Sequence, residues 1–146
     1  MQTFLPVVID HSGPLSCVRS AKVLDRQRLG KQRVEALQIY RVLSGKSTGW
    51  RHHPAVRMWE GYTDALMLYG RVMCFEWGAR GYKDNCLNQF VPWPPKNDVV
   101  WPDWMWDPAF AASHRSNLLR KNPEWYGKFG WTEPTDLPYV WPVKHR

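Results

Sequence analysis

The sequence lacks several features that would place it in a well-defined class of protein. It has only three cysteines, Cys17, Cys74 and Cys86, which are far apart and form no CxxC pair. Their odd number and spacing argue against a zinc knuckle and a disulfide framework, and they fit a reducing cytosol. No apolar run approaches the roughly 20 residues of a membrane-spanning helix, and the first residues lack the basic segment of a signal peptide. We therefore expect a cytoplasmic protein with no membrane partner.

The familiar catalytic signatures are missing as well. There is no GxSxG, no P-loop and no HExxH motif. His52 and His53 are adjacent, so they cannot easily face one metal ion from a helix or a strand, and His114 stands alone. Because lone histidines are seldom metal ligands, we expect no metal site.

The chain does have an excess of positive charge near its N-terminus. The formal net charge is +7; residues 1–60 carry ten Lys or Arg against four Asp or Glu, whereas residues 61–146 carry ten against nine. A polyanion such as nucleic acid would meet the N-terminal part first. Charge alone still allows a basic protein without such a partner. A length of 146 residues, 44% of them hydrophobic, suffices for one domain with one core.

Helical spacing and capping residues predict an all-α, compact single domain of about three main helices with long Pro/Trp-rich loops. Asp25 suits an N-cap, Gly45 a helix end, and Pro54 and Pro108 the first helical position. The predicted helices cover residues 16–24, 25–43, 54–80, 107–121 and, briefly, 123–126. One apolar face at helical spacing consists of Leu29, Ala36, Leu37, Tyr40 and Leu43.

Glycines in the second long helix give a further expectation. Gly61 and Gly70 lower the helix propensity of 54–80, which indicates close packing against another helix, and Gly81 ends the helix.

Two other segments are not predicted to be helical. Residues 1–15 predict an extended arm tied onto the core, with one brief strand at 4–9.

Residues 82–106 form an unusual segment, rich in proline and tryptophan, which we treat as an insert. It carries four prolines and four tryptophans, Trp93, Trp101, Trp104 and Trp106. A long loop of this kind in a compact domain is usually functional. A rigid flap that covers the core is an equally good interpretation, and a surface for binding another protein is a weaker one.

The most informative stretch is 24–40, which reads as a basic helix with one acid, Glu35, beyond its first turn. A single carboxylate among cations is expected to stay ionised and fixed. An α-amine, whose ordinary pKa is near ~7.7–8.0, can attack a sugar carbon that bears a base, and a carboxylate can assist the proton transfers. The plain alternative for Glu35 is a surface pair with Lys31, worth a few tenths of a kcal/mol. The residues alone favour that alternative.

Three segments together resemble the pyrimidine-dimer DNA glycosylases of the phage endonuclease V type and their bacterial relatives. LDRQRLGKQRVEAL (24–37) is similar to the catalytic-helix pattern, with the acid at Glu35. HPAVRMW (53–59) and ARGY (79–82) are similar to the start and end of a family helix. DPAFAASHRSNLLRKNPEWYGKFG (107–130) resembles the D-P-x-F, S-H-x-S-N-L-x-R-K and P-x-W/Y-Y elements, and is the most specific of the three.

The resemblance implies a helical fold with the N-terminal arm threaded toward the centre and no cofactor. It implies an N-glycosylase with β-elimination lyase activity on the abasic product, acting on kinked double-stranded DNA with one nucleotide flipped out. The α-amine of Met1 would be the nucleophile and Glu35 the essential carboxylate. Trp125 and Tyr126 resemble the aromatic segment near the damaged base.

The residues that we expect at the DNA are mostly cations, placed there by charge and by these motifs. They are Gln2, Arg26, Arg28, Lys31, Arg33, Arg51, His53, Arg57, His114, Arg115, Asn117, Lys121, Trp125 and Tyr126. We expect a monomer that acts near the nucleoid of a bacterial or phage-infected cell.

Two departures from the family pattern affect the prediction. Gln2 is bulky, so Met1 is expected to be retained and to supply the amine itself. Val34 stands where the family has an arginine before the acid, with Arg33 one place earlier and about 100° around the helix. A modified pyrimidine other than the dimer is therefore a possible substrate. The alternative is a DNA-binding protein of the same fold without catalysis.

Overall fold

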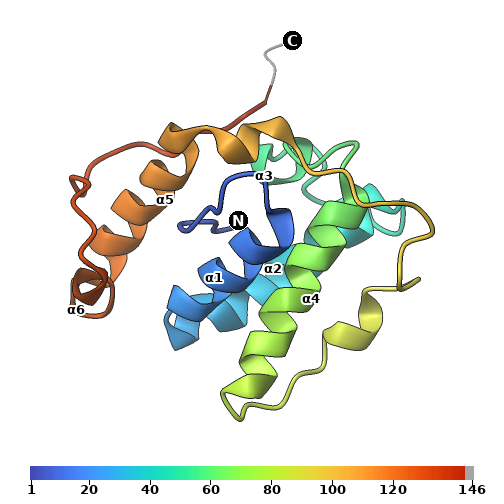
Figure 1. The fold of residues 1–146 in the computed structure, drawn as a ribbon. Helices are drawn as coiled ribbons and strands as arrows, with labels where there is room; N and C mark the ends of the chain where they lie inside the picture. Colours follow the sequence, from blue (N-terminus) through green and yellow to red (C-terminus); the bar gives the residue numbers. More distant parts are fainter. Residues whose placement is uncertain (144–146) are drawn as a thin grey trace.

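The computed structural model describes residues 1–143, and the regular secondary structure in this range is helical (Figure 1). Its helices are α1 (Gly13–Val23), α2 (Arg26–Leu43), α3 (Pro54–Arg57), α4 (Thr63–Ala79), α5 (Pro108–Lys121) and α6 (Pro123–Tyr126). Short 3₁₀ turns lie at Leu87–Gln89, Asp103–Trp106 and Gly127–Phe129. No strand is present in residues 1–143, which confirms the all-α prediction.

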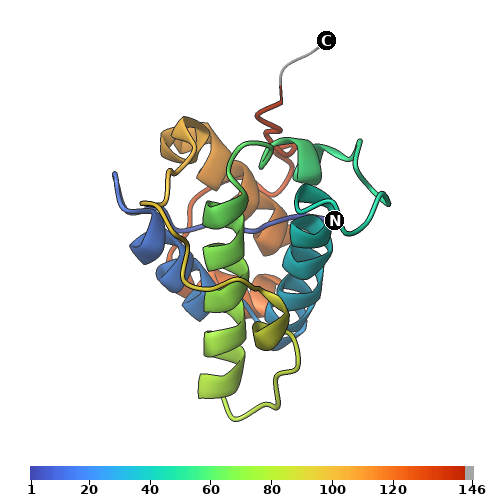
Figure 2. The ribbon, with the colours of Figure 1, turned by 90° about the vertical axis from the view of Figure 1, so that its right-hand side faces the viewer.

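Helices α2 and α4 form the centre of the fold, with α1 on the other side of α4 (Figures 1 and 2). The apolar face predicted for α2 is buried, except that Leu43 is half-buried. A Cβ atom at Gly70 of α4 would lie 3.2 Å from Ala36 Cβ of α2 and 2.4 Å from the Phe90 ring. Gly70 therefore allows the close helix contact that its position predicted.

The helix predicted over 54–80 is wrong as one continuous element. It is divided into α3 and α4, with a turn between Arg57 and Thr63. Gly61 has φ +85°, a left-handed conformation that glycine adopts without strain and that cannot continue a right-handed helix. Gly61 thus breaks the helix, whereas Gly81, with φ +91°, follows its end as predicted.

The N-terminal arm runs through the middle of the molecule, behind α4 in Figure 2. It is extended but forms no strand at 4–9, because side chains of the surrounding helices accept its backbone hydrogen bonds. Phe4 N–H donates to Gln32 Oε1 at 2.9 Å, and Leu5 N–H donates to His114 Nδ1 at 2.9 Å. Further along, the N–H groups of Val7 and Ile9 donate to serine hydroxyls of α1. The arm is therefore fixed by α1, α2 and α5 together.

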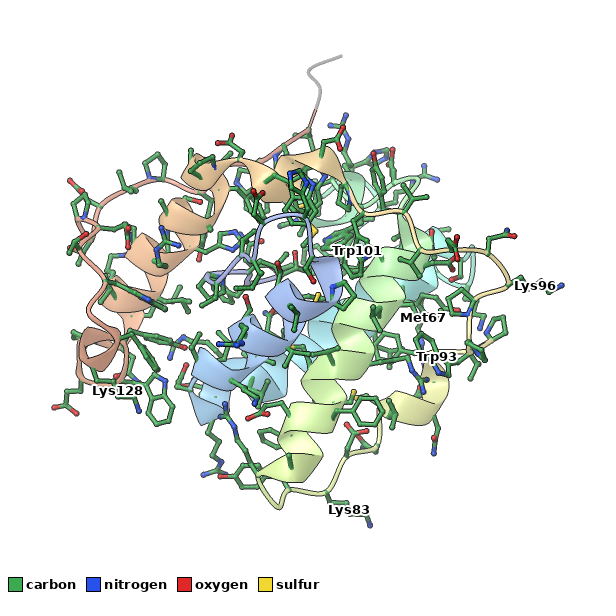
Figure 3. The ribbon with its side chains drawn as sticks, viewed as in Figure 1. Met67, Lys83, Trp93, Lys96, Trp101 and Lys128 are labelled. Atoms are coloured by element: carbon green, nitrogen blue, oxygen red, sulfur yellow. The ribbon has the colours of Figure 1, made fainter. Side chains whose placement is uncertain are left out.

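Part of the proline- and tryptophan-rich insert covers the core. Trp101 lies over the start of α1, where a Cβ at Gly13 would come within 2.0 Å of its ring (Figure 3). Trp104 packs edge-on against Trp59 at 5.0 Å between ring centroids, and its Nε1 donates to Met58 O. These contacts favour the flap among the interpretations of this segment.

The chain after α6 is extended and lies along α5. Ser116 Oγ donates to Pro134 O and accepts from Leu137 N–H, and Asn117 Nδ2 donates to Leu137 O. None of the helices described in residues 1–143 is both long enough and apolar enough to cross a membrane.

Candidate active site

The arm brings the N-terminus to the carboxylate of Glu35 on α2. Gln2 N–H donates to Glu35 Oε2 at 3.0 Å, and Gln32 Nε2 lies 3.4 Å from the same oxygen. Consecutive backbone nitrogens are less than ~4 Å apart, so the Met1 α-amine lies within about 7 Å of this oxygen. Two residues that are 34 positions apart in the chain thus meet at one place.

The carboxylate is held by the arm more firmly than by the lysine of the plain alternative. Lys31 Nζ is 3.9 Å from Glu35 Oε1, and the lysine side chain is 69% exposed, whereas that of Glu35 is 16% exposed. An exposed pair at this distance contributes little. The two contacts at Oε2 involve a buried backbone N–H and a buried glutamine, and they set the direction of the carboxylate.

A cavity of about 240 Å³ opens at this point. It is lined by Met1, Gln2, Phe4, Gln27, Arg28, Lys31, Gln32, Glu35, Lys121 and Tyr139. Three of the described lining residues are cations, and Glu35 is the only acid among them. The pKa of Lys121 is lowered, first by partial burial and then by Arg28, Arg120 and Lys31. Positive charge therefore exceeds negative charge around the cavity, as an anionic ligand requires.

Arg28 is held at the cavity by Asp25, a buried carboxylate at the start of α2. Its Nη1 donates to Asp25 Oδ2 at 3.0 Å. The other Asp25 oxygen accepts from Tyr126 Oη at 2.5 Å, and Asp25 N–H donates back to Tyr126 Oη at 3.0 Å. Burial, and then the hydrogen bond to Asp25, raise the pKa of Tyr126, so the phenol stays protonated. Asp25 was predicted as an N-cap; it starts the helix, but its side chain holds Arg28.

His53 connects the site to the next part of the chain. Its Nδ1 accepts from Ala55 N–H at the start of α3, and its ring lies edge-on to Trp50 and Trp141 at 6.0 and 5.9 Å. Burial, and then the positive charge of the amino terminus, lower the pKa of His53, while Glu35 acts in the opposite direction. The charges of the amino terminus and of Glu35 therefore both act on His53.

The remaining predicted DNA contacts fall into two groups. Arg26, Arg51 and Lys31 are exposed, and Arg57 and Trp125 are half-buried at the surface. Lys128 Nζ lies 3.4 Å from the centroid of the Trp125 ring. These residues are placed where a ligand could reach them.

The second group is turned inward, where direct contact with DNA is not supported. Arg33 is buried, with Nη1 2.5 Å from Asp84 Oδ1, and Arg115 is paired with Glu133 at 2.8 Å. Asn117 is buried and bonded to the C-terminal segment, and Tyr126 is buried against Asp25. His114 is fully buried, and burial followed by Arg115 lowers its pKa to about 3.

Gln32 is the main site residue that sequence reasoning passed over. Its Oε1 accepts from Phe4 N–H and Tyr69 Oη, while its Nε2 donates to Gln2 O and reaches Glu35. Gln32 lies one turn before Glu35 on the same side of α2, and this spacing is the signal that could have identified it. Within residues 1–143, no group of three or more His, Cys, Asp or Glu is placed to hold a metal ion.

The described residues thus define a small helical protein with an amino-terminal site suited to an anionic ligand. A comparison with protein families matches residues 1–89 to the family described as pyrimidine dimer DNA glycosylase. This match covers more than half of the chain, including the arm, α2 and α4, and the chain belongs to that family. No match was found among the curated proteins or the solved structures. The family is one of DNA glycosylases, with DNA as substrate.

Proposed function

We propose that this protein excises a damaged or modified pyrimidine from double-stranded DNA and then cleaves the strand at the abasic site. The observation that carries the proposal is the hydrogen bond from Gln2 N–H to Glu35 Oε2, which sets the amino end of the chain beside a fixed carboxylate. Both groups line a cavity whose other charged residues are cations. An amine and a carboxylate suffice for this chemistry.

In the first step, the neutral α-amine of Met1 attacks C1′ of the nucleotide. The C1′–N bond breaks, and the base leaves with the electron pair and takes up a proton. The C1′–O4′ bond of the sugar then breaks, O4′ takes up the proton that the attacking nitrogen loses, and an iminium ion forms between that nitrogen and C1′. Glu35 stabilises the positive charge that develops on the sugar and on the iminium ion.

In the second step, a base removes a proton from C2′ of the iminium intermediate. The C3′–O bond breaks, the 3′ phosphate leaves, and a C2′–C3′ double bond forms. Water then hydrolyses the iminium, which returns the free amine and releases an unsaturated aldehyde. Glu35 is the carboxylate nearest to the amine end, and we assign the proton transfer to it.

The cations around the cavity would bind the phosphates on either side of the extruded nucleotide. Arg28 has a fixed direction because Asp25 and Tyr126 hold it, whereas Lys31 and Lys121 are exposed point charges. Val34 is 45% exposed next to Glu35, where the family pattern has a cation. We therefore propose a modified pyrimidine whose recognition does not need that charge.

Reduction with borohydride in the presence of an abasic duplex tests this mechanism. The iminium intermediate becomes a stable amine on reduction, so a covalent protein–DNA adduct is expected. A chain with an acetylated N-terminus should form none, and mass spectrometry of the adduct should place the DNA on Met1. Glu35→Gln should form little adduct. Glu124 is an exposed acid on α6, so Glu124→Gln is the matched control and should form the adduct normally.

Two outcomes would contradict the proposal. Duplex binding without any adduct would instead indicate a DNA-binding protein of this fold without catalysis. An adduct that persists after acetylation of the N-terminus would move the nucleophile to a lysine, of which Lys31 and Lys121 line the cavity.

A further inference from the structure

The loop between α2 and α3, residues 44–53, is the most exposed connection near the candidate site. Residues 44–52 are all exposed, and in Figure 2 the loop projects on the same side of the molecule as the N-terminus. The loop carries Lys46, Arg51, His52 and His53 and no acid. Its other residues are serines, glycines, one threonine and one tryptophan.

Trp50 is an unusual residue for such a loop. It is 62% exposed, so its indole buries little surface in the folded chain. Its φ is +65°, in the left-handed region that is strained for a bulky residue and free for glycine. The preceding residue is Gly49, which could adopt a left-handed conformation without strain, yet it is Trp50 that has the positive φ. An exposed ring held at a conformational cost is a candidate for contact with a ligand.

The ring is joined to the candidate site through His53. Trp50 lies edge-on to His53 at 6.0 Å between ring centroids, and burial, followed by the charge of the amino terminus, lowers the pKa of His53. Next to Trp50, Arg51 Nε donates to His52 Nε2 at 3.2 Å, so cationic and aromatic groups lie side by side. The loop therefore presents an exposed aromatic ring among cations on the side of the molecule where the N-terminus lies.

We propose that Trp50 inserts its indole between bases of the duplex, next to the nucleotide that is extruded toward Met1. Aromatic side chains stack on any base, and apolar side chains inserted between base steps unstack and kink DNA. The cations of the loop would bind the phosphates of the same step. This proposal rests on the proposed function, because it needs a DNA substrate whose target nucleotide enters the cavity.

A duplex with 2-aminopurine opposite a tetrahydrofuran abasic analogue tests the insertion directly, because an indole that enters the stack displaces the opposing base. The analogue cannot form an iminium ion, so the measurement does not depend on the chemical step. The fluorescence of 2-aminopurine is quenched by stacking, and binding of the native chain should increase it. Trp50→Ala should remove most of the increase and weaken binding about tenfold, the size expected when one stacked base is lost. Trp50→Phe should keep part of both effects.

Phe75→Ala is the matched control, since Phe75 is an exposed aromatic residue (60%) on α4. It should behave as the native chain. A second measurement separates the two proposals: Trp50→Ala should lose less cleavage on a single-stranded abasic oligonucleotide than on the duplex, because no base pair has to be opened there. Cleavage of the abasic duplex should fall with the affinity.

Three results would overturn the insertion. The first is an unchanged fluorescence increase with Trp50→Ala, and the second is an equal loss of cleavage on single-stranded and duplex DNA. The third is a loss with Phe75→Ala as large as that with Trp50→Ala, which would show that the effect is not specific to Trp50. A native chain that forms no covalent adduct but increases the fluorescence would refute the catalytic proposal and leave the insertion supported.

Discussion

The walls of the cavity and the inner side of α5 contain the same kinds of residues and use them in opposite ways. At the cavity, Arg28, Lys31 and Lys121 outnumber one carboxylate, and the two lysines are exposed to solvent. On α5, Arg115 is neutralised by Glu133, and His114 is buried and neutral. The first region is built to receive a partner, and the second holds the arm and the C-terminal segment in place. A polar residue type by itself therefore does not indicate a ligand, because its partners inside the protein decide how it is used.

Glu35→Gln should give the largest effect on activity and almost none on stability. Glutamine keeps an oxygen that can accept from Gln2 N–H, but it removes the charge and the proton acceptor. We expect strand cleavage to fall about 10³-fold, within the range for loss of a general acid–base group. The measurement is single-turnover cleavage of an abasic duplex, together with urea unfolding. A cleavage loss below tenfold would remove Glu35 from the chemistry.

His114→Ala should give the reverse pattern, with a large effect on stability. The change leaves the buried Leu5 N–H without an acceptor and opens a cavity beside Phe110, whose ring centroid lies 4.4 Å away. We expect the free energy of unfolding to fall by about 3 kcal/mol. His114→Gln, which restores an acceptor, should recover part of it. Equal stability of all three chains would refute the role of His114 in holding the arm.

The same histidine predicts a pH dependence of stability. Its pKa is about 3 in the folded chain, against 6.5 as its ordinary value. Below pH 6.5 the unfolded chain therefore binds a proton that the folded chain does not, and stability falls as the pH falls. The slope should approach about 1.4 kcal/mol per pH unit. Chemical unfolding from pH 7 to 4.5 should show this slope in the native chain and a smaller one in His114→Gln. Identical slopes would contradict the prediction.

Lys121→Ala should give the smallest effect, confined to binding. Its neighbours at the cavity are cations, so its removal should change stability by less than about 0.5 kcal/mol. Binding to an abasic-analogue duplex should weaken, and the slope of log K against log salt should decrease by about one. Lys83→Ala, an exposed lysine beyond the end of α4 (Figure 3), should leave that slope unchanged. A similar change with both variants would mean non-specific attraction only.

The parts of the fold that could be predicted from sequence are those set by local chemistry. Asp107 caps α5 through Ala109 N–H, Pro108 begins it, and Gly45 follows α2 with φ +78°. The break at Gly61 was missed because a glycine in a helical pattern indicates close packing as readily as a left-handed turn. The arm is extended and tied to the core as predicted, but the brief strand at 4–9 was wrong because its hydrogen-bond partners are side chains up to 109 positions away.

The site was predicted only in part for a similar reason. The place of Glu35 on α2 follows from helical spacing, and its partner at the amino end follows from the family resemblance. Whether an arginine or histidine faces DNA depends on partners such as Glu133 and Asp84, which no local pattern reveals. The 107–130 segment was the most specific motif, yet its polar residues on α5 mostly hold other segments of the chain.

The hydrogen bond between Leu5 N–H and His114 has a consequence for how the site comes into being. The chain carries the Met1 amine and Glu35 within its first 35 residues, but the arm that joins them is also held by α5, whose His114 lies 109 positions after Leu5. A growing chain that lacks α5 therefore has both reactive groups but only part of the contacts that fix the arm. Full assembly of the site therefore depends on the packing of a helix that contributes no reactive group to it.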